Sequence, residues 1–318
     1  MFNLAFEYKL NPTTGQEAIF SDWLEVCRRA YNYALGERKD WYKSRSCRID
    51  ACSLTGEYII AADAPRPTYS SQCKALTQAR KTNPQLARVQ SQVLQQTLRR
   101  LEKAFVSMWE QGHGFPRFKK VGTMRSFVFP QIGMGAIENS TIKLPVIGRI
   151  KFRQSRPIPD GVALKQARIL KRASGWFVML TLQWDANIPQ IMPHGEAVGI
   201  DVGILHFLAT SSGKTYPNPR PFKMLQRKLR LLQKRVSRKV KGSSNRKKAQ
   251  AKVSKLHEKI ANIRKDYYWK LARELCESVG MVFVENLNLV GVSSRHSRQT
   301  LFGCRMGPVF PDSRTMLL

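Results

Sequence analysis

Residues 197–203 read Ala-Val-Gly-Ile-Asp-Val-Gly, an apolar run that carries a single carboxylate, Asp201. A short apolar run of this kind is typical of a buried strand. Residues 281–285, Met-Val-Phe-Val-Glu, repeat the pattern and end on Glu285. Residues 207–210, followed by Gly-Lys at 213–214, indicate a hairpin directly after the first run. The sequence therefore predicts a sheet in which two strands each carry a carboxylate at their end.

Carboxylates at the ends of adjacent strands have a specific chemical use. They can hold two Mg²⁺ ions on either side of a phosphate, as a two-metal nuclease of the RNase H-like kind requires. In that interpretation Asp201 and Glu285 are catalytic, metal-binding residues. A solitary acid at a strand end is also often a cap or an ion-pair partner, so the pattern alone leaves both interpretations open.

Residues 220–270, between the two strands, are strongly basic. They contain nineteen Lys and Arg residues but only two acids, Glu258 and Asp266. Two apolar stripes with helical spacing, separated by Gly242, predict a pair of helices that we call the basic hairpin. A charged run is usually a solvated surface, but this one is too one-sided and predicts contact with phosphate. The candidate contacts are Arg227, Lys228, Lys234, Arg235, Arg238, Lys239, Arg246, Lys247, Lys248 and Arg264.

The N-terminal half begins with a predicted strand, because apolar residues alternate over residues 2–10. Helices follow it. Thr14 and Glu17 fit a capping box at the start of the first, and a second helix follows a loop that contains two prolines. The third has apolar residues at spacings of three and four throughout residues 86–108. These helices predict a bundle.

Short strands replace the helices from residue 127 onward. A proline-rich linker, residues 188–193, closes this region. Because the N-terminal strand belongs with these later strands, we expect the bundle to be inserted into a small β-barrel. The predicted strands are residues 127–129, 142–144, 149–152, 163–170 and 176–184.

Residues 114–120, Gly-Phe-Pro-Arg-Phe-Lys-Lys, connect the helices to these strands and are called the basic loop. Aromatic rings interleaved with cations suit base stacking combined with phosphate contact. The segment can also be an ordinary loop. The candidate nucleic-acid contacts here are Arg117, Phe118, Lys119 and Lys120, together with Arg28 in the first helix.

The composition agrees with a nucleic-acid partner. The 318 residues include 54 Lys and Arg against 22 Asp and Glu, a net charge of +32. With a net charge of this size the cationic side chains repel one another unless a polyanion neutralises them. No long apolar span or compact basic amphipathic helix indicates a membrane as that polyanion. The N-terminus has no secretory signal pattern, so we expect a cytoplasmic protein.

The six cysteines contain no C-x-x-C pair, so no zinc ribbon or redox motif can be assigned. In a reducing compartment we expect free thiols. A metal site made from Cys47, Cys52 and Cys73 stays open, although their spacing is unusual for one.

A series of motifs occurs in order along the chain: Pro12-Thr13 with Gln16, Cys27-Arg28-Arg29-Ala30-Tyr31-Asn32, the basic loop, Ile142-Lys143-Leu144-Pro145, Gly199-Ile200-Asp201-Val202-Gly203, Ser237-Arg238-Lys239 and Val284-Glu285-Asn286-Leu287-Asn288. Together they resemble the TnpB (OrfB) family of bacterial insertion-sequence proteins. The resemblance implies RNA-guided cleavage of DNA, with guide RNA and target DNA as partners and Mg²⁺ or Mn²⁺ as cofactor. In this family Asp201 and Glu285 match the first two catalytic carboxylates.

The likeness ends near residue 291. The family pattern continues with a zinc ribbon and a third catalytic aspartate, whereas the residues after Glu285 include one acid, Asp312, and one cysteine, Cys304. We do not expect Asp312 to be the third ligand, because no framework positions it. Zinc is not expected either. We interpret residues 293–318 as a frameshifted or prematurely ended tail, and expect no cleavage and exposed apolar surface on residues 281–285.

The predicted fold class is α+β multidomain. Residues 1–10 and 113–187 form a wedge-like β-barrel, and residues 11–112 an inserted helical recognition domain. Residues 196–292 form an incomplete RNase H-like (RuvC-type) α/β domain, and residues 293–318 an aberrant tail.

Two main function classes remain. One is an RNA-guided, metal-dependent DNA endonuclease, and the other is a protein of that descent that binds RNA and DNA without cutting. A third, a guide-free DNA-binding transposase-type accessory protein or regulator, requires a helix-turn-helix within residues 14–41. We expect a monomer in each case.

Overall fold

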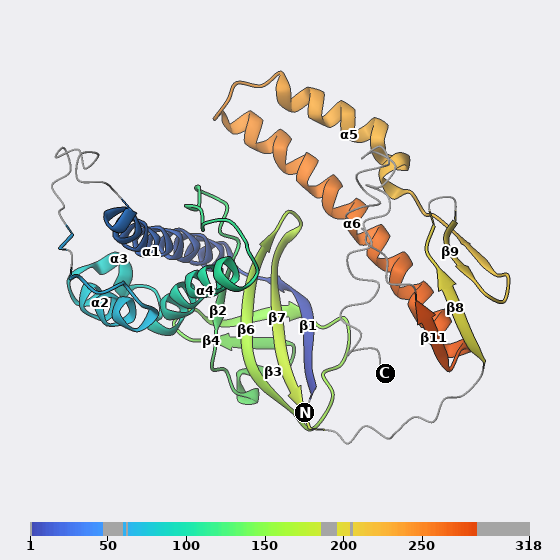
Figure 1. Cartoon of the computed structure of the whole chain (residues 1–318), viewed down its shortest axis with the longest axis horizontal. Helices are drawn as coiled ribbons and strands as arrows, with labels where there is room; N and C mark the ends of the chain where they lie inside the picture. The colour runs from blue at the N-terminus through green and yellow to red at the C-terminus, as the bar shows by residue number, and fades with distance from the viewer. Residues whose placement is uncertain (1, 47–59, 62, 186–195, 204–205, 285–318) are drawn as a thin grey trace. The chain divides into compact units, whose positions relative to one another are not determined.

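The computed structural model describes residues 2–46, 60–61, 63–185, 196–203 and 206–284. Contacts divide the chain into two compact units, Met1–Asn187 and Ile188–Leu318. Each unit has a sheet and helices of its own (Figure 1). Residues 188–193, the predicted linker, and residues 293–318, the predicted aberrant tail, lie outside the described residues.

The first unit contains a seven-stranded antiparallel sheet in the order β2-β6-β7-β1-β5-β4-β3. The N-terminal strand belongs with the later strands, as predicted, and it lies in the middle of the sheet, paired with β7 and β5. Buried and less buried residues alternate along β7 because successive side chains point to opposite faces. The strands are β1 (Phe2–Asn11), β2 (Ser126–Phe129), β3 (Ile137–Glu138), β4 (Thr141–Leu144), β5 (Gly148–Arg153), β6 (Val162–Arg172) and β7 (Gly175–Trp184).

The sheet curls without closing, so the predicted β-barrel is instead an open half-barrel. Its edges, β2 and β3, do not pair with each other in the described part of the chain. A helix packs on the sheet, which gives its apolar face a partner without closure. The rings of Phe20 and Trp23 lie 5.8 and 5.6 Å from the ring of Phe127. Helices and sheet thus share one core.

Between β1 and β2 the described residues form four helices (Figure 1). The first is a single helix of 33 residues, so the helix pair proposed within residues 14–41 is wrong. Its capping box lies one residue before the predicted pair: Gln16 N donates to Thr13 Oγ1 (3.3 Å), and Thr13 N donates to Gln16 Oε1 (3.1 Å). The helices are α1 (Thr14–Ser46), α2 (Tyr69–Thr82), α3 (Pro84–Ala87) and α4 (Ser91–Glu110).

The predicted third helix is interrupted between α3 and α4. Gln90 adopts an extended backbone and caps α4. At the break the guanidinium of Arg80 donates to the carbonyl oxygens of Leu86 (3.2 Å) and Val89 (2.9 Å). A side chain that satisfies these carbonyls allows the helix to end there. Apolar spacing alone did not indicate this break.

The described residues of the second unit form a four-stranded sheet in the order β10-β9-β8-β11. Strands β10, β9 and β8 are antiparallel neighbours, and β11 pairs with β8 in parallel. The predicted hairpin after the first run and the strand near residue 281 are thereby confirmed. The strands are β8 (Ala197–Asp201), β9 (His206–Thr210), β10 (Thr215–Pro217) and β11 (Met281–Val284).

The basic hairpin consists of α5 (Pro221–Ser237) and α6 (Ser244–Ser278), as predicted, but α6 continues past the expected end at residue 270. Its C-terminal part packs on the sheet of this unit, where the ring of Tyr268 stacks on that of Phe207 with centroids 4.9 Å apart. Its 35 residues span about 50 Å at the rise of an α-helix. The N-terminal part of α6 therefore extends beyond the sheet together with α5 (Figure 1).

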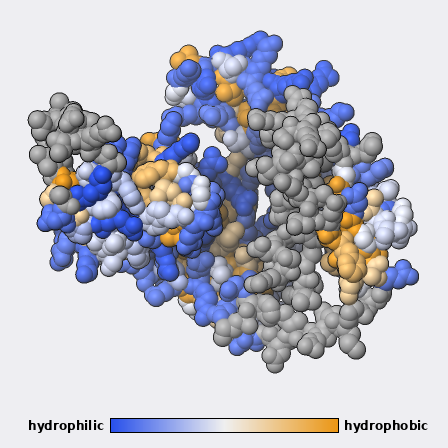
Figure 2. All heavy atoms as spheres, viewed as in Figure 1, coloured by the Kyte–Doolittle hydropathy of each residue, from blue (hydrophilic) through white to orange (hydrophobic). Residues whose placement is uncertain are grey.

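Strand β11 is more exposed than a buried strand. The side chains of Met281, Phe283 and Val284 are 45%, 59% and 47% exposed. In the described part of the chain β11 is an edge strand with β8 as its one neighbour. Figure 2 shows apolar surface on the sheet of this unit. For the described residues of β11 the prediction of a buried strand is wrong, because three of its apolar side chains are exposed.

Candidate carboxylate site and nucleic-acid interface

Asp201 is the last residue of β8 and its side chain is exposed. Residue Ile200 pairs with Val284, the last residue of β11. Because parallel strands end at the same edge of a sheet, the carboxyl ends of β8 and β11 lie side by side. Glu285 is the next residue in the sequence after Val284 and lies outside the described residues.

A shallow hollow surrounds this edge. It is lined by both strand ends and by residues of and after β9, including Thr210 and Ser211. The Ser211 hydroxyl accepts a hydrogen bond from the Gly199 N–H (3.0 Å), and Thr210 Oγ1 donates to the carbonyl of Lys214 (3.1 Å). The Ser211 hydroxyl thus holds the backbone of β8 two residues before Asp201, and the Thr210 hydroxyl holds the turn between β9 and β10.

The hollow offers oxygen atoms, the ligands that Mg²⁺ prefers. Asp201 is the one carboxylate that lines it in the described part of the chain, and no group of three or more His, Cys, Asp or Glu residues there could hold a metal. Asp201 thus fits half of a two-carboxylate site. Glu285 as its companion stays a prediction, and Asp312 also lies outside the described residues.

The described cysteines, Cys27, Cys73 and Cys276, are free thiols, as expected. Burial raises the pKa of Cys27 to about 11, so this thiol is unreactive at neutral pH. The other members of the suggested metal site, Cys47 and Cys52, lie outside the described residues.

Among the described helices, none has the length and apolar character needed to cross a bilayer.

The two helices of the basic hairpin pack through Leu229, Leu256 and Ile260, which are buried. Most of the predicted contact residues lie on the outside of this small core. Hydrophilic residues make up most of the visible face of the hairpin (Figure 2). The exposed candidates are Arg227, Lys228, Lys234, Arg235, Arg238, Lys239, Lys247 and Lys248.

Arg246 and Arg264, also predicted contacts, are half-buried. Arg246 Nη1 donates to the carbonyl oxygens of Val236 (3.3 Å) and Lys239 (2.9 Å), so this side chain closes the connection between α5 and α6. Of the two acids within residues 220–270, Asp266 pairs with Lys270 (2.9 Å). The hairpin therefore retains a large positive charge.

The basic loop is held by side chains of α1. Asn32 Oδ1 accepts a hydrogen bond from the Lys119 N–H (2.7 Å), and Asn32 Nδ2 donates to the Lys119 carbonyl (2.9 Å). Arg28 Nη1 donates to the same carbonyl (3.1 Å). Arg28 in turn donates two hydrogen bonds to Glu25, of 2.6 and 2.8 Å. Arg28, a predicted nucleic-acid contact, is thus bonded to the loop.

The loop presents its other candidates to solvent. Arg117 and Lys120 are exposed, and Phe118 is 48% exposed. The Lys39 ammonium lies 5.2 Å from the centroid of the Phe118 ring. Lys119 is half-buried, with its ammonium 5.3 Å from the centroid of the Tyr31 ring. A ring and several cations therefore lie together on one short segment, as base stacking with phosphate contact requires.

Two features of the first unit were not predicted from the sequence. The Asn32 and Glu25 contacts join α1 to a loop far along the chain, and no local pattern indicates them. A groove of about 230 Å³ between α4 and strands β2 and β6 is a further basic surface. Its cations are Arg99, Arg100, Lys103 and Arg168, which are spread over two elements.

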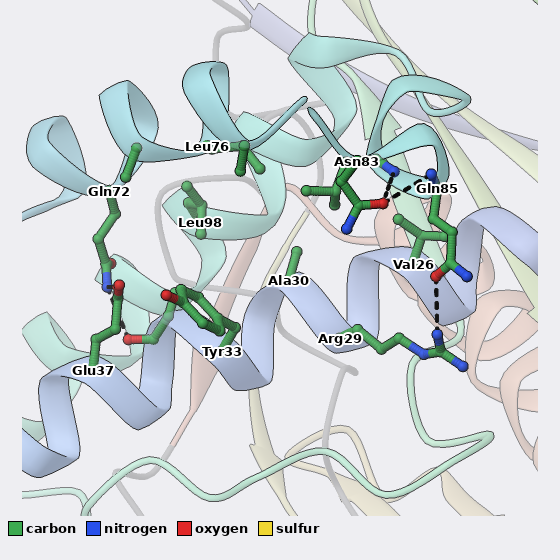
Figure 3. A pocket seen from close by; sticks show the side chains of 14 residues that line it. Val26, Arg29, Ala30, Tyr33, Glu37, Gln72, Leu76, Asn83, Gln85 and Leu98 are labelled. Atoms are coloured by element: carbon green, nitrogen blue, oxygen red, sulfur yellow. Dashed lines mark hydrogen bonds between the residues drawn. The ribbon is translucent and has the colours of Figure 1, made fainter. Parts of the chain in front are cut away.

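A larger pocket, of about 400 Å³, lies between α1 and helices α2 to α4 (Figure 3). Its polar side chains bond to one another or to the backbone. Gln72 Nε2 donates to the Ala34 carbonyl (2.8 Å), and Arg29 Nη1 donates to Gln85 Oε1 (3.0 Å). Asn83 Oδ1 caps α3. These polar groups already have hydrogen-bond partners within the protein, so they do not indicate a ligand in this pocket.

Two family profiles match the sequence. One, described as "Probable transposase", matches residues 184–295, which include most of the second unit. The other, described as "Helix-turn-helix domain", matches residues 1–47, where the structure has β1 and the single helix α1. The matches thus include the region of Asp201 and the helix that holds the basic loop.

Curated relatives match over most of the chain. A protein of Escherichia coli (strain K12) named "Putative RNA-guided DNA endonuclease InsQ" is 30% identical over 289 residues, which cover 91% of this chain and 67% of the relative. A "Putative RNA-guided DNA endonuclease" of Streptomyces pristinaespiralis is 31% identical over 90% of this chain and 67% of its own length. On these matches and the ordered motifs, the chain belongs to the TnpB (OrfB) family of insertion-sequence proteins.

Proposed function

We propose that this chain is an RNA-guided DNA endonuclease by descent, which binds guide RNA and target DNA and, as the 318-residue polypeptide, does not cleave. The names of its relatives support RNA and DNA as partners. The observation that carries the proposal is the parallel pairing of β11 with β8, because it brings the ends of two carboxylate-bearing segments to one edge.

The proposed metal ligands are Asp201 and Glu285. The register pairs Val284 with Ile200. Asp201 follows Ile200 in β8, and Glu285 follows Val284 in the sequence. Mg²⁺ or Mn²⁺ bound there would activate a water and stabilise the leaving oxygen. The Asp201 carboxylate would hold the ion, and the hydrogen bond from the Gly199 N–H to the Ser211 hydroxyl would help to fix the backbone of β8.

Nucleic acid would bind to the basic hairpin and the basic loop. The hairpin supplies many exposed cations for phosphates, and the loop adds the exposed ring of Phe118 for a base. A monomer would suffice, because each surface lies within one compact unit.

The absence of cleavage rests on the number of ligands. A Mg²⁺ ion demands near-ideal octahedral geometry, and two carboxylates hold a metal pair loosely. Of the residues after Glu285, Asp312 is the one further acid, and its surroundings of proline, serine and arginine predict no framework. We therefore propose no third ligand among these residues, and the expected absence of cleavage depends on this.

Cleavage is tested with guide RNA, matched DNA and Mg²⁺ or Mn²⁺, comparing the chain with Asp201→Ala. We expect target binding and no cleavage from either protein. Cleavage that disappears in Asp201→Ala would contradict the proposed deficiency and make Asp312 the next residue to substitute.

The metal site is tested separately by Mn²⁺ binding, followed by electron paramagnetic resonance. Asp201→Asn should lower the affinity for Mn²⁺. Asp266→Asn, which removes an acid that pairs with Lys270 on α6, is the matched control and should leave it unchanged. Equal Mn²⁺ binding by all three proteins would refute Asp201 as a ligand.

The guide-free regulator has one observation in its favour, the helix-turn-helix description of the profile that matches residues 1–47. The uninterrupted α1 removes the helix pair that this function needs there. Binding to duplex DNA of a defined sequence, with nucleic-acid-free protein and no RNA, would revive it.

A further inference from the structure

We propose that Asn32 is a positioning residue, which fixes the basic loop in the conformation that binds nucleic acid without touching the nucleic acid itself. This inference rests on the proposed role of the basic loop. It assigns a purpose to a side chain in the middle of α1 that is half-buried and bonded to a single residue of the loop, Lys119.

The geometry is that of one amide paired with another. Asn32 both accepts from the Lys119 N–H at 2.7 Å and donates to the Lys119 carbonyl at 2.9 Å. A planar carboxamide can satisfy the donor and the acceptor of one residue together. Aspartate has the acceptor without the donor, and alanine has neither. The position therefore selects asparagine for its two-sided hydrogen bonding.

Arg28 adds a second bond to the same carbonyl and is itself fixed. Its guanidinium donates to both oxygens of Glu25, one turn earlier on α1, and its side chain is 15% exposed. The Lys119 carbonyl thus accepts from two side chains of one rigid helix. Held in this way, Arg28 contributes to binding through the loop.

The contacts lie at the centre of a segment that would otherwise have much freedom. Gly112 and Gly122 flank the basic loop with φ of 65° and 75°, values that favour glycine. Because glycine has no side chain, these two residues also allow many other backbone conformations. Fixing Lys119 also fixes its neighbours Phe118 and Lys120, whose side chains are exposed. A loop that is ordered before binding loses less entropy when the ligand arrives.

The experiment measures the affinity of nucleic-acid-free protein for a fluorescein-labelled single-stranded RNA by anisotropy. Asn32→Ala should bind about fivefold more weakly, the size expected for two hydrogen bonds that preorganise a loop. Asn32→Asp keeps the side-chain volume and the bond from the Lys119 N–H but loses the donor, so it should also bind more weakly. This second variant serves if Asn32→Ala does not fold.

A double-mutant cycle separates positioning from stability. The stripped loop is a variant with Arg117→Ala, Phe118→Ala and Lys120→Ala together. In this variant Asn32→Ala should weaken the binding of RNA by less than about twofold, because Asn32 acts through those three side chains. The same fivefold loss in both backgrounds would overturn the proposal, since Asn32 would then act elsewhere.

Gln72→Ala is the matched control on the same helical bundle. Gln72 is buried and its amide donates to the Ala34 carbonyl of α1 at 2.8 Å, but it does not contact the basic loop. It should lower the melting temperature without changing the affinity for RNA. An equal loss of affinity in Gln72→Ala would mean that general destabilisation, and not positioning, explains the effect.

Two outcomes distinguish failure of this inference from failure of the proposed function. If the stripped loop binds RNA more weakly and Asn32→Ala binds normally, the loop binds nucleic acid and the positioning role is refuted. If the stripped loop binds as tightly as the unchanged protein, the loop itself is no contact surface and both fail.

Discussion

The basic loop and the basic hairpin both carry cations, but they are built in opposite ways. The loop is short, and its backbone is fixed at Lys119 by two side chains of α1. The hairpin has nineteen Lys and Arg residues in its sequence, and most of its predicted contacts extend from exposed helix faces. Binding at the loop should therefore depend on the position of a few groups, and binding at the hairpin on the number of its charges.

This difference separates two kinds of binding. Attraction between many cations and phosphates depends strongly on salt and little on the exact side chain. Stacking on an aromatic ring depends on the ring's orientation and little on salt. A chain with both surfaces can therefore use the hairpin for affinity and the loop for a fixed register, and substitutions in the two regions should behave differently.

The largest effect is expected from neutralising the hairpin. Replacing Arg227, Lys228, Lys234, Arg235, Lys247 and Lys248 together with glutamine should weaken binding of single-stranded RNA about 100-fold at moderate salt. Anisotropy titrations measure the loss. The glutamines keep helix propensity, so the circular dichroism spectrum should not change. Affinity within threefold of the unchanged protein would remove the hairpin from the interface.

A smaller effect is expected at the loop. Phe118→Ala should weaken binding of the same RNA about tenfold, because it removes a stacking surface. Phe118→Leu is the matched control, since it keeps an apolar side chain of similar volume without an aromatic face. It should lose as much affinity as the alanine variant. If leucine restores binding, Phe118 acts by packing and not by stacking.

The hairpin was predictable from the sequence because its signal is local. Apolar residues at helical spacing, one glycine turn and an excess of cations all lie within residues 220–270. The β strands and the position of Asp201 at a strand end followed from equally local patterns. The contact between Asn32 and Lys119 joins residues 87 apart, so no spacing rule could indicate it.

Other differences came from tertiary contacts as well. The break between α3 and α4 depends on carbonyls that accept from Arg80, which belongs to the preceding helix. The half-barrel stays open where Phe20 and Trp23 of α1 pack against Phe127 of β2. The sequence of β11 is as apolar as that of a buried strand, and its exposure follows from its place at the edge of the sheet that the described residues form.

A modest decrease in the affinity for RNA is expected at acidic pH. Hydrogen bonds from Arg28 hold the pKa of Glu25 below its ordinary value. The pair therefore stabilises the folded state above the ordinary pKa of a glutamate, and this contribution is lost as the pH falls through the lowered value. The affinity for RNA should fall by about twofold over that range. Glu25→Gln should remove this step, and a step of equal size in Glu25→Gln would exclude Glu25 as its origin.

The smallest effect is expected when the hairpin keeps its charge. Arg227→Lys with Arg235→Lys should change the affinity for RNA by less than about twofold, because counterion release depends on the number of cations. Competition titrations against the unchanged protein resolve such a difference. A loss of tenfold would show that these arginines make shaped contacts, and the contrast with the loop would disappear.

The most direct test compares how binding depends on salt in three proteins: the unchanged chain, the six-glutamine hairpin variant and Phe118→Ala. The account predicts that the hairpin variant reduces the slope of log affinity against log salt by about 4, at about 0.7 for each phosphate contact on a single strand. Phe118→Ala should bind more weakly at every salt concentration with an unchanged slope. A hairpin variant with the slope of the unchanged chain, or a reduced slope in Phe118→Ala, would contradict it.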